Sequence, residues 1–294
     1  MVNRVFVFVL LALLPLAAPA AIRLTDDTGR IIVLAAPATR IVSLAPDLTE
    51  LAYDAGAGQD VVGTVSYSDY PPAARKLPHI GDAFSVDLER LVALQPDLIL
   101  AWRGGTPVSL IGRLRALHLP VVVLGTHALT DIARNLELIG QATGHEVMAR
   151  TAARAFLTGL GKLRKQYAGR VPVSVFYEIS ATPLFTVGGQ QSISRLIALC
   201  GGKNIFAELT QLAAPVSLAA VVARDPQVIF TGDDGDARSR LAAWQQFREM
   251  TAVRHGHLFI VSSDLTARAT PRILEGGAEI CRDLDSVRTG TGEH

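Results

Sequence analysis

The chain has 294 residues, with 28 Lys and Arg against 27 Asp and Glu and a formal net charge of +1. This even balance argues against a nucleic-acid-binding protein, which carries a strongly basic surface. The length suffices for two domains of ordinary size, and a hydrophobic content of 49% suits buried parallel sheets.

Residues 1–20 are expected to be a signal peptide that is not part of the fold. Arg4 supplies a positive charge, an apolar run follows over residues 5–16, and Ala18-Pro19-Ala20 forms a small-residue cleavage pattern. The apolar run is shorter than the roughly 20 residues that span a membrane. We therefore expect an exported, periplasmic protein that is cleaved near Ala20, with no cysteine there to carry a lipid anchor.

Residues 21–144 are expected to form a first α/β lobe. The pattern predicts a hairpin over 22–34 and strands over 40–44, 61–65, 98–101 and 121–124. Asp47 and Glu50 stand at capping-box spacing and are expected to open the first helix. Thr130 is expected to cap a helix that ends near Thr143.

A long amphipathic helix is expected over 145–168. At 1.5 Å per residue it would span roughly 36 Å, about the width of a small domain. Apolar residues recur at three- and four-residue spacing: Met148, Ala152, Ala155, Phe156, Gly159, Leu163 and Tyr167. The sequences on its two sides resemble each other, so we expect this helix to connect two similar lobes.

The internal repeat is visible by eye. Val86–Ala101 and Val216–Thr231 both predict a helix that ends just before a proline, followed by a buried strand. A looser pair, Thr49–Gly56 and Ser194–Gly201, predicts a helix that a glycine ends. One α/β plan is therefore expected twice.

Residues 169–294 are expected to form the second lobe. Strands are predicted over 173–177, 184–187, 228–231 and 258–261, with helices over 192–199 and 273–284, the latter opened by Pro271. The predicted fold class is α/β, with two Rossmann-like lobes of mainly parallel strands joined by the single helix 145–168. A single connecting helix permits little closure, so a largely preformed cleft is expected.

The two cysteines, Cys200 and Cys281, both lie in the expected second lobe. In an oxidising compartment they either form a disulfide or remain as two buried thiols. Their spacing excludes a CxxC redox or zinc motif.

Ligands of parallel sheets bind at the carboxyl ends of the strands. The loops expected there hold a set that is aromatic with few charges: Tyr67, Tyr70, Trp102, Phe185, Asp264 and Arg268. Such a set suits a large, flat, partly apolar ligand, although each aromatic could instead pack in the fold. Asp264 and Arg268 could form a structural ion pair or present polar groups to the ligand.

Motifs of catalysis are missing from the sequence, which has no Gly-x-Ser-x-Gly elbow, Walker loop or His-Glu-x-x-His pattern. His255 and His257 stand in a turn, where opposite faces or solvent exposure are expected rather than joint metal ligation. Neither an enzyme, a metal site nor a cofactor is therefore expected.

Five segments resemble the substrate-binding proteins of cobalamin ABC importers. They are RIVSLAPDLTEL (40–51), SYSDYPP (66–72), VDLERLVALQPDLILAWRGG (86–105), CGGKNIF (200–206) and SSDLTARATPR (262–272). The first is shared with binding proteins for haem and ferric siderophores. The resemblance implies a class III periplasmic binding protein, two lobes on one helix with the ligand in the cleft, that delivers a corrinoid to a permease and its ATPase subunits.

The resemblance also implies roles for individual residues. Tyr67, Trp102 and Phe185 would pack on cobalamin beside Arg103 and Gly104, which follow Trp102. Asp264 and Arg268 would contact the polar periphery of the ligand. Glu89 would dock onto arginines of the permease, and Cys200 and Cys281 would form a disulfide.

Three departures from the family pattern stand out. Ala83 replaces a tryptophan, with Phe84 beside it as a stand-in, and Ala213 replaces a second tryptophan. The repeat aligns Glu89 with Ala219, so the second lobe lacks a docking glutamate. Three alternatives therefore stay open: haem or ferric-siderophore capture with Tyr67 as an iron ligand, a corrinoid scavenger or sensor without a permease, and an enzyme on this scaffold. A monomer is expected.

Overall fold

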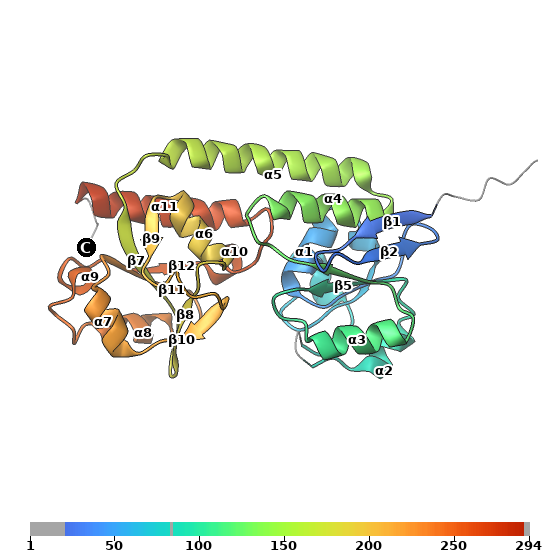
Figure 1. Cartoon of the computed structure of the whole chain (residues 1–294), viewed down its shortest axis with the longest axis horizontal. Coiled ribbons are helices and arrows are strands. Elements are labelled where there is room, and N and C mark those ends of the chain that lie inside the picture. Colours follow the sequence, from blue (N-terminus) through green and yellow to red (C-terminus); the bar gives the residue numbers. More distant parts are fainter. Residues whose placement is uncertain (1–20, 83–84, 291–294) are drawn as a thin grey trace, which may run out of the picture.

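The computed structural model describes residues 21–82 and 85–290. Two α/β lobes lie side by side, and helix α5 (Glu146–Tyr167) runs across both of them (Figure 1). The expected signal peptide and the pair Ala83 and Phe84 lie outside the described residues. Within the described ranges no helix combines the length and apolar character needed to cross a bilayer. The predicted fold class is confirmed.

The first lobe has a four-stranded parallel sheet in the order β4-β3-β5-β6. Its strands are β3 (Ile41–Ser43), β4 (Val61–Gly63), β5 (Leu98–Trp102) and β6 (Val121–Leu124). The predicted hairpin is present as β1 (Ile22–Thr25) and β2 (Ile31–Leu34). The helices are α1 (Pro46–Asp54), α2 (Leu88–Ala93), α3 (Val108–Ala116) and α4 (Asp131–Thr143), with 3-10 turns at Gly58–Asp60 and Pro72–Lys76.

Residues of β5 alternate between two buried faces. Leu98 and Leu100 join the cluster that contains α1 and α4, whereas Ile99 and Ala101 join the cluster that contains α2 and α3. Because a strand points successive side chains to opposite faces, a fully apolar strand requires helices on both sides. The sheet is therefore the middle layer of three, and its carboxyl edge is left free for a site.

The second lobe repeats this plan with one strand reversed. Its sheet runs β10-β8-β7-β11-β12, with β9 also paired to β7. The strands are β7 (Val173–Ala181), β8 (Leu184–Val187), β9 (Gly202–Asn204), β10 (Ala213–Pro215), β11 (Val228–Gly232) and β12 (Leu258–Val261). The helices are α6 (Ser192–Leu199), α7 (Leu218–Arg224), α8 (Ala237–Trp244), α9 (Thr251–Arg254), α10 (Ser263–Thr266) and α11 (Ile273–Thr289). Only β8 opposes its neighbours, because a tight hairpin joins it to β7.

The internal repeat extends to single backbone conformations. Gln95 and Asp225 hold equivalent positions before a proline, and both have positive φ values, of 47° and 39°. A residue before proline is disfavoured in the α region, so each helix ends there and the chain turns into the next strand. Gly56 and Gly201, which end α1 and α6, also have positive φ values of 95° and 73°.

At the next pair of repeat positions, Asp97 and Gln227, a side chain accepts a hydrogen bond from the backbone near the start of a neighbouring strand. The Asp97 carboxylate accepts a hydrogen bond of 2.8 Å from the Arg40 backbone N–H. The Gln227 side-chain carbonyl accepts one of 2.9 Å from the Ser174 backbone N–H. The same structural task is thus performed twice by different polar side chains.

Helix α5 spans the expected residues, and its buried stripe agrees with the prediction at Phe156, Leu163 and Tyr167 but not at the other positions. Met148 is 57% exposed, and the buried residues are Ala149, Ala153, Phe156, Leu160, Leu163 and Tyr167. The crossing of α4 over α5 decides this, because a side chain on Gly140 of α4 would collide with Ala149. A single buried cluster includes this stripe and core residues of both lobes.

The predicted capping box of α1 is wrong. The helix begins at Pro46, after Ala45, and no side chain caps it, since proline presets the φ of the first helical residue. Asp47 therefore lies in the first turn, and the Glu50 carboxylate instead bonds arginines of the second lobe.

Two other helices begin where predicted, but the roles expected of Thr130 and Pro271 at their starts are wrong. Thr130 precedes α4 but its side chain makes no cap; the Asp131 carboxylate instead accepts hydrogen bonds from the backbone N–H groups of His127 and Ala128. Helix α11 begins at Ile273, two residues after Pro271. Both differences arise because local loop hydrogen bonds, which the pattern does not encode, decide the first turn.

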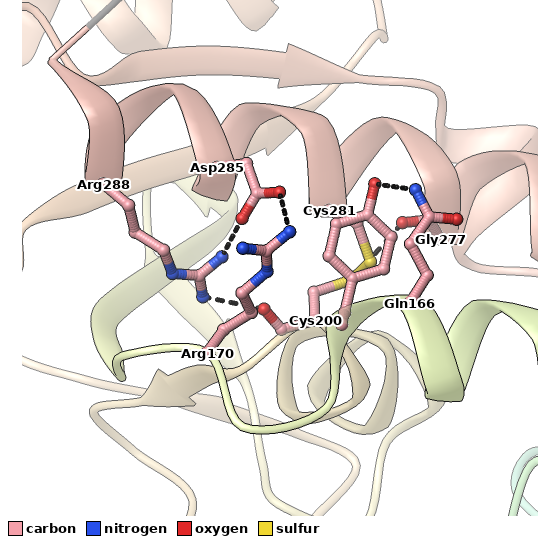
Figure 2. Close-up of a disulfide and its surroundings, with 8 residues drawn as sticks. Gln166, Arg170, Cys200, Gly277, Cys281, Asp285 and Arg288 are labelled. Carbon is pink, nitrogen blue, oxygen red and sulfur yellow. Dashed lines mark hydrogen bonds and ion pairs between the residues drawn. A yellow bond between two sulfur atoms is a disulfide. The ribbon is translucent and has the colours of Figure 1, made fainter.

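A disulfide joins Cys200, at the end of α6, to Cys281 of α11 (Figure 2). Both residues are fully buried, and the predicted pairing is confirmed. Beside it, Asp285 accepts from Arg170 and Arg288, and Arg288 also donates to the Cys200 carbonyl at 2.7 Å (Figure 2). The disulfide therefore ties two helices of the second lobe together at their packing interface.

Replacing both cysteines, as Cys200→Ala with Cys281→Ala, should lower the free energy of unfolding by about 4 kcal/mol. The disulfide closes a loop of 81 residues, and the chain-entropy model gives this magnitude for such a loop. Urea denaturation followed by circular dichroism measures the change, with reduced wild-type protein as the comparison. Thiol labelling of both cysteines in native, unreduced protein would contradict the pairing.

Candidate ligand-binding cleft

A cleft opens where the carboxyl edges of the two sheets face each other. The first lobe contributes Asp47 and residues 102–104 and 125–127, and the second contributes residues 190–192, Leu212 and Ala267, among others. The cavity between them has a volume of about 200 Å³. Of the predicted site residues it brings together Trp102, Arg103 and Gly104.

Trp102 is the last residue of β5 and its indole is half-buried. The ring lies on the backbone of the following turn: a Cβ atom on Gly104 would stand 2.7 Å from the indole, and one on Gly105 would stand closer still. The turn is fastened by the Thr106 hydroxyl, which accepts from the Trp102 backbone N–H at 3.0 Å. The two glycines after Trp102 are therefore required for the indole to lie flat at the cleft.

Arg103 points away from the centre of the cleft. Its guanidinium donates to the Asp27 carbonyl, in the turn of the N-terminal hairpin. The Asp27 carboxylate in turn pairs with Arg134 at 2.6 Å and accepts from the Gly125 N–H. Asp27 thus positions the loop that follows β6, a role that sequence reasoning missed.

Arg268 is the centre of an ion-pair network that crosses from the second lobe to the first. Its guanidinium lies 2.8 Å from Glu50, 2.8 Å from Asp69 and 2.9 Å from Asp264. It also donates to the Tyr67 carbonyl at 3.1 Å. The ion pair between Asp264 and Arg268 is therefore formed, but Arg268 has its main partners in the opposite lobe.

Glu50 is the first-lobe side of this network and is only 1% exposed. Besides Arg268 it accepts two hydrogen bonds from Arg272, at 2.9 and 3.1 Å. The Arg272 guanidinium also stacks 3.6 Å from the centre of the Tyr70 ring, a cation–π contact. A buried carboxylate needs such partners, and here both cations come from the other lobe.

The predicted aromatic residues do not all meet in the cavity. The Tyr67 side chain is 79% exposed and the residue has a positive φ of 66°. Phe185 is half-buried on β8 beside Pro215 of β10, and is not among the cavity-lining residues. The structure therefore places Trp102 in the lining of the cavity and both Tyr67 and Phe185 outside that lining.

The pKa values of three carboxyl groups on and near α1 are shifted: those of Asp47 and Asp54 are raised, and that of Asp69 is lowered. Burial raises the pKa of Asp47 to about 6, with repulsion from Glu50 adding to the effect. Burial likewise raises the pKa of Asp54 to about 6. Burial also acts to raise the pKa of Asp69, but its hydrogen bond to Arg268 and the charge of Arg268 outweigh this and leave the pKa lowered.

Glu89 and Ala219 occupy equivalent positions on the exposed faces of α2 and α7. In Figure 1 both helices lie on the side of the molecule opposite α5. The chain thus presents one carboxylate on this face at the repeated position, in the first lobe only.

His255 and His257 do not point to opposite faces as expected. Their rings stack with centroids 5.5 Å apart, and their Nδ1 atoms lie 3.0 and 3.1 Å from backbone carbonyl oxygens. His255 is exposed, which agrees with the alternative expectation of solvent exposure. Within the part of the chain that the structure describes, no group of three or more His, Cys, Asp or Glu converges as a metal site.

Two lobes on one long helix, with a cleft between the carboxyl edges of their sheets, define a substrate-binding protein of the helical-backbone class. The sequence model of the family described as "Periplasmic binding protein" matches residues 41–265. The chain therefore belongs to the periplasmic binding protein family.

Among the proteins to which this chain is similar in sequence are vitamin B12-binding proteins. The chain is 36% identical over 253 residues to the vitamin B12-binding protein of Vibrio parahaemolyticus, covering 86% of this chain and 91% of that protein. It is 36% identical over 284 residues to the vitamin B12-binding protein of Yersinia pestis, covering 96% and 98%.

Solved structures agree with this placement. The periplasmic vitamin B12-binding protein of Vibrio cholerae has a TM-score of 0.81 at 35% identity, covering 86% of this chain and 98% of that one. A periplasmic haem-binding protein from Roseiflexus has a TM-score of 0.74 at 22% identity, covering 84% and 98%, which shows a common fold.

Replacing Glu50 by Gln should lower the free energy of unfolding by about 2–4 kcal/mol. The change leaves two arginine side chains, only 13% and 19% exposed, without their buried counter-charge. The control is Asp264→Asn, which removes a 56% exposed partner of the same Arg268 and should cost below about 1 kcal/mol. Urea denaturation measures both variants, and equal costs would refute a special role for Glu50.

Proposed function

We propose that this protein captures cobalamin or a related corrinoid in the inter-lobe cleft and delivers it to an ABC import permease and its ATPase subunits. The observation that carries the proposal is the Trp102 indole, laid flat on two glycines at a cleft between two lobes. The named relatives, which bind vitamin B12, support the choice of ligand. Export with cleavage near Ala20 and a monomeric state are part of the same proposal.

The ligand contacts follow from the positions of the aromatic and charged groups. Trp102 offers a flat apolar surface to a corrin ring. Tyr67, which is exposed and whose carbonyl bonds Arg268, would offer a second. Asp264 and Arg268 would bind amide groups at the ligand periphery. Phe185 remains a candidate that would contact a ligand only in a wider cleft, and Phe84 remains a candidate outside the described residues.

The cleft has to widen before a corrinoid enters. Its volume of about 200 Å³ is below the 300–1,000 Å³ that is typical of sites for drug-sized ligands, and a corrinoid is larger than these. Opening separates Arg268 and Arg272 from Glu50 and frees the guanidinium groups for the ligand. We therefore propose a cleft that is closed by ion pairs when empty, rather than the largely preformed one expected from the connecting helix.

Trp102→Ala should weaken cobalamin binding by about 1–3 kcal/mol, because stacking area and contact are lost. Calorimetric titration with cobalamin, cobinamide and haem measures this and tests the ligand class at the same time. Val108→Ala, an exposed apolar truncation outside the cleft in the same lobe, should leave affinity unchanged. Denaturation of the variant checks that its fold is kept.

Two outcomes of this titration would overturn the proposal. Haem binding without corrinoid binding would favour the haem alternative, with Tyr67 as the candidate iron ligand. A Trp102→Ala variant that is much less stable but binds cobalamin with unchanged affinity would make the indole a packing residue and misplace the site.

Glu89→Ala should nearly abolish corrinoid uptake while leaving affinity for the ligand intact. A permease arginine would form a bidentate contact with this carboxylate, and losing one partner of a buried charged pair costs about 2–5 kcal/mol. Glu137→Ala on α4, also an exposed helical glutamate but away from α2, is the control. Uptake by cells that carry each variant is the measurement.

The complementary change is Ala219→Glu, which should strengthen docking if the permease keeps a matching arginine. It restores the carboxylate at the repeated position of the second lobe. Unchanged uptake with Glu89→Ala would reject the docking role and favour a scavenger or sensor that works without a permease.

A further inference from the structure

The two lobes meet along two seams that the internal repeat relates to each other. Helices α1 and α6 are equivalent in the repeat, and so are the segments after β6 and β12, which lead into α4 and α11. At the first seam the segment after β12 meets α1, where Arg268 and Arg272 bind Glu50. The second seam is the counterpart, where α6 meets the segment after β6.

The second seam is an open groove of about 490 Å³ rather than a closed ion pair. Residues 128–130 of the first lobe line one side, and Arg195 of α6 lines the other. Arg195 stands at the position that aligns with Glu50 in the repeat. The repeat has thus placed a cation where the first seam has an anion.

Arg195 lacks the partner that this position has at the first seam. Its Nε atom is buried and has no hydrogen-bond partner among residues 21–82 and 85–290. A buried donor without an acceptor is costly, and such groups are rare unless a bound molecule satisfies them. Arg195 therefore lines the groove with a guanidinium group whose hydrogen-bonding capacity the described residues do not fully use.

The rest of the groove has the charge and polarity of a site for an organic anion. Arg164 and Arg170 from the end of α5 add positive charge, of which Arg170 shares Asp285 with Arg288 (Figure 2). None of the described residues that line the groove is acidic. The opposite part of the wall is apolar, formed by Leu129, Tyr167 and Leu199.

We propose that this groove binds a phosphoryl group attached to an apolar body. The phosphate oxygens would accept from Arg195 and Arg164, since guanidinium groups match phosphate geometry and stay charged. The apolar body would lie on Leu129, Tyr167 and Leu199. The ligand is a soluble organic phosphate or the headgroup of a phospholipid, which share this chemistry.

The groove is separate from the cleft proposed for the corrinoid. No residue lines both cavities, although each is formed by both lobes. A ligand in the groove would contact both lobes, through Leu129 of the first and Arg195 of the second. Its binding should therefore stabilise the arrangement of the lobes without occupying the corrinoid site.

Titration calorimetry of the full chain with phenyl phosphate tests the proposal. The wild-type protein should bind it, and Arg195→Gln should weaken binding at least about tenfold. Arg154→Gln, an exposed arginine of α5 outside the groove, is the matched control and should change affinity less than about twofold. Arg164→Gln should weaken binding as well, and it serves if Arg195→Gln fails to fold.

A second arm distinguishes the two sources of the phosphate. Sedimentation with phosphatidylcholine vesicles, with and without phosphatidylglycerol, tests a headgroup. Retention that needs both phosphatidylglycerol and Arg195 assigns the groove to lipid, whereas phenyl phosphate binding without retention assigns it to a soluble ligand. The proposal is overturned by neither form binding, or by Arg154→Gln weakening binding as much as Arg195→Gln.

Discussion

The relative placement of the two lobes depends on one buried carboxylate, Glu50, and the arginines that neutralise it. Helix α5 packs along one side of both lobes, so it leaves their opposite edges to be positioned by contacts across the cleft. Glu50 is almost inaccessible to solvent, and Arg268 and Arg272 both reach it from the second lobe. Because an unpaired charge at this depth is strongly unfavourable, these ion pairs favour contact between the two lobe edges.

This kind of contact suits a protein that must open. Apolar surface, once exposed, has no comparable partner in water, whereas guanidinium and carboxylate groups regain hydration when they separate. The connecting helix meanwhile keeps one apolar cluster continuous between the lobes, so opening need not disrupt the core. On opening, the ion pairs around Glu50 would separate, while the apolar cluster around α5 would keep the two lobes joined.

Sequence reasoning recovered the features that are periodic or repeated and missed those that depend on distant partners. The lobes, α5 and the place of Trp102 at the end of a strand were predicted because apolar spacing and the repeat are local signals. The pairing of Glu50 with Arg268 joins residues 218 positions apart, and the local pattern around Glu50 matched a capping box instead. The buried stripe of α5 was predicted only in part, because the close approach at Gly140 of α4 decides which face turns inward.

The repeat also separates positions that keep the same structural role in both lobes from positions that do not. Gln95 and Asp225, like Asp97 and Gln227, differ in side chain but keep the same backbone task, since each lobe needs that turn and that strand to fold. Positions that face outside their own lobe have no such constraint. There the two copies have separated into Glu50 and Arg195 at the seams, and into Glu89 and Ala219 on the exposed helices. A duplicated fold can therefore acquire two unlike surfaces, and the functions proposed for its two halves differ at these unequal positions.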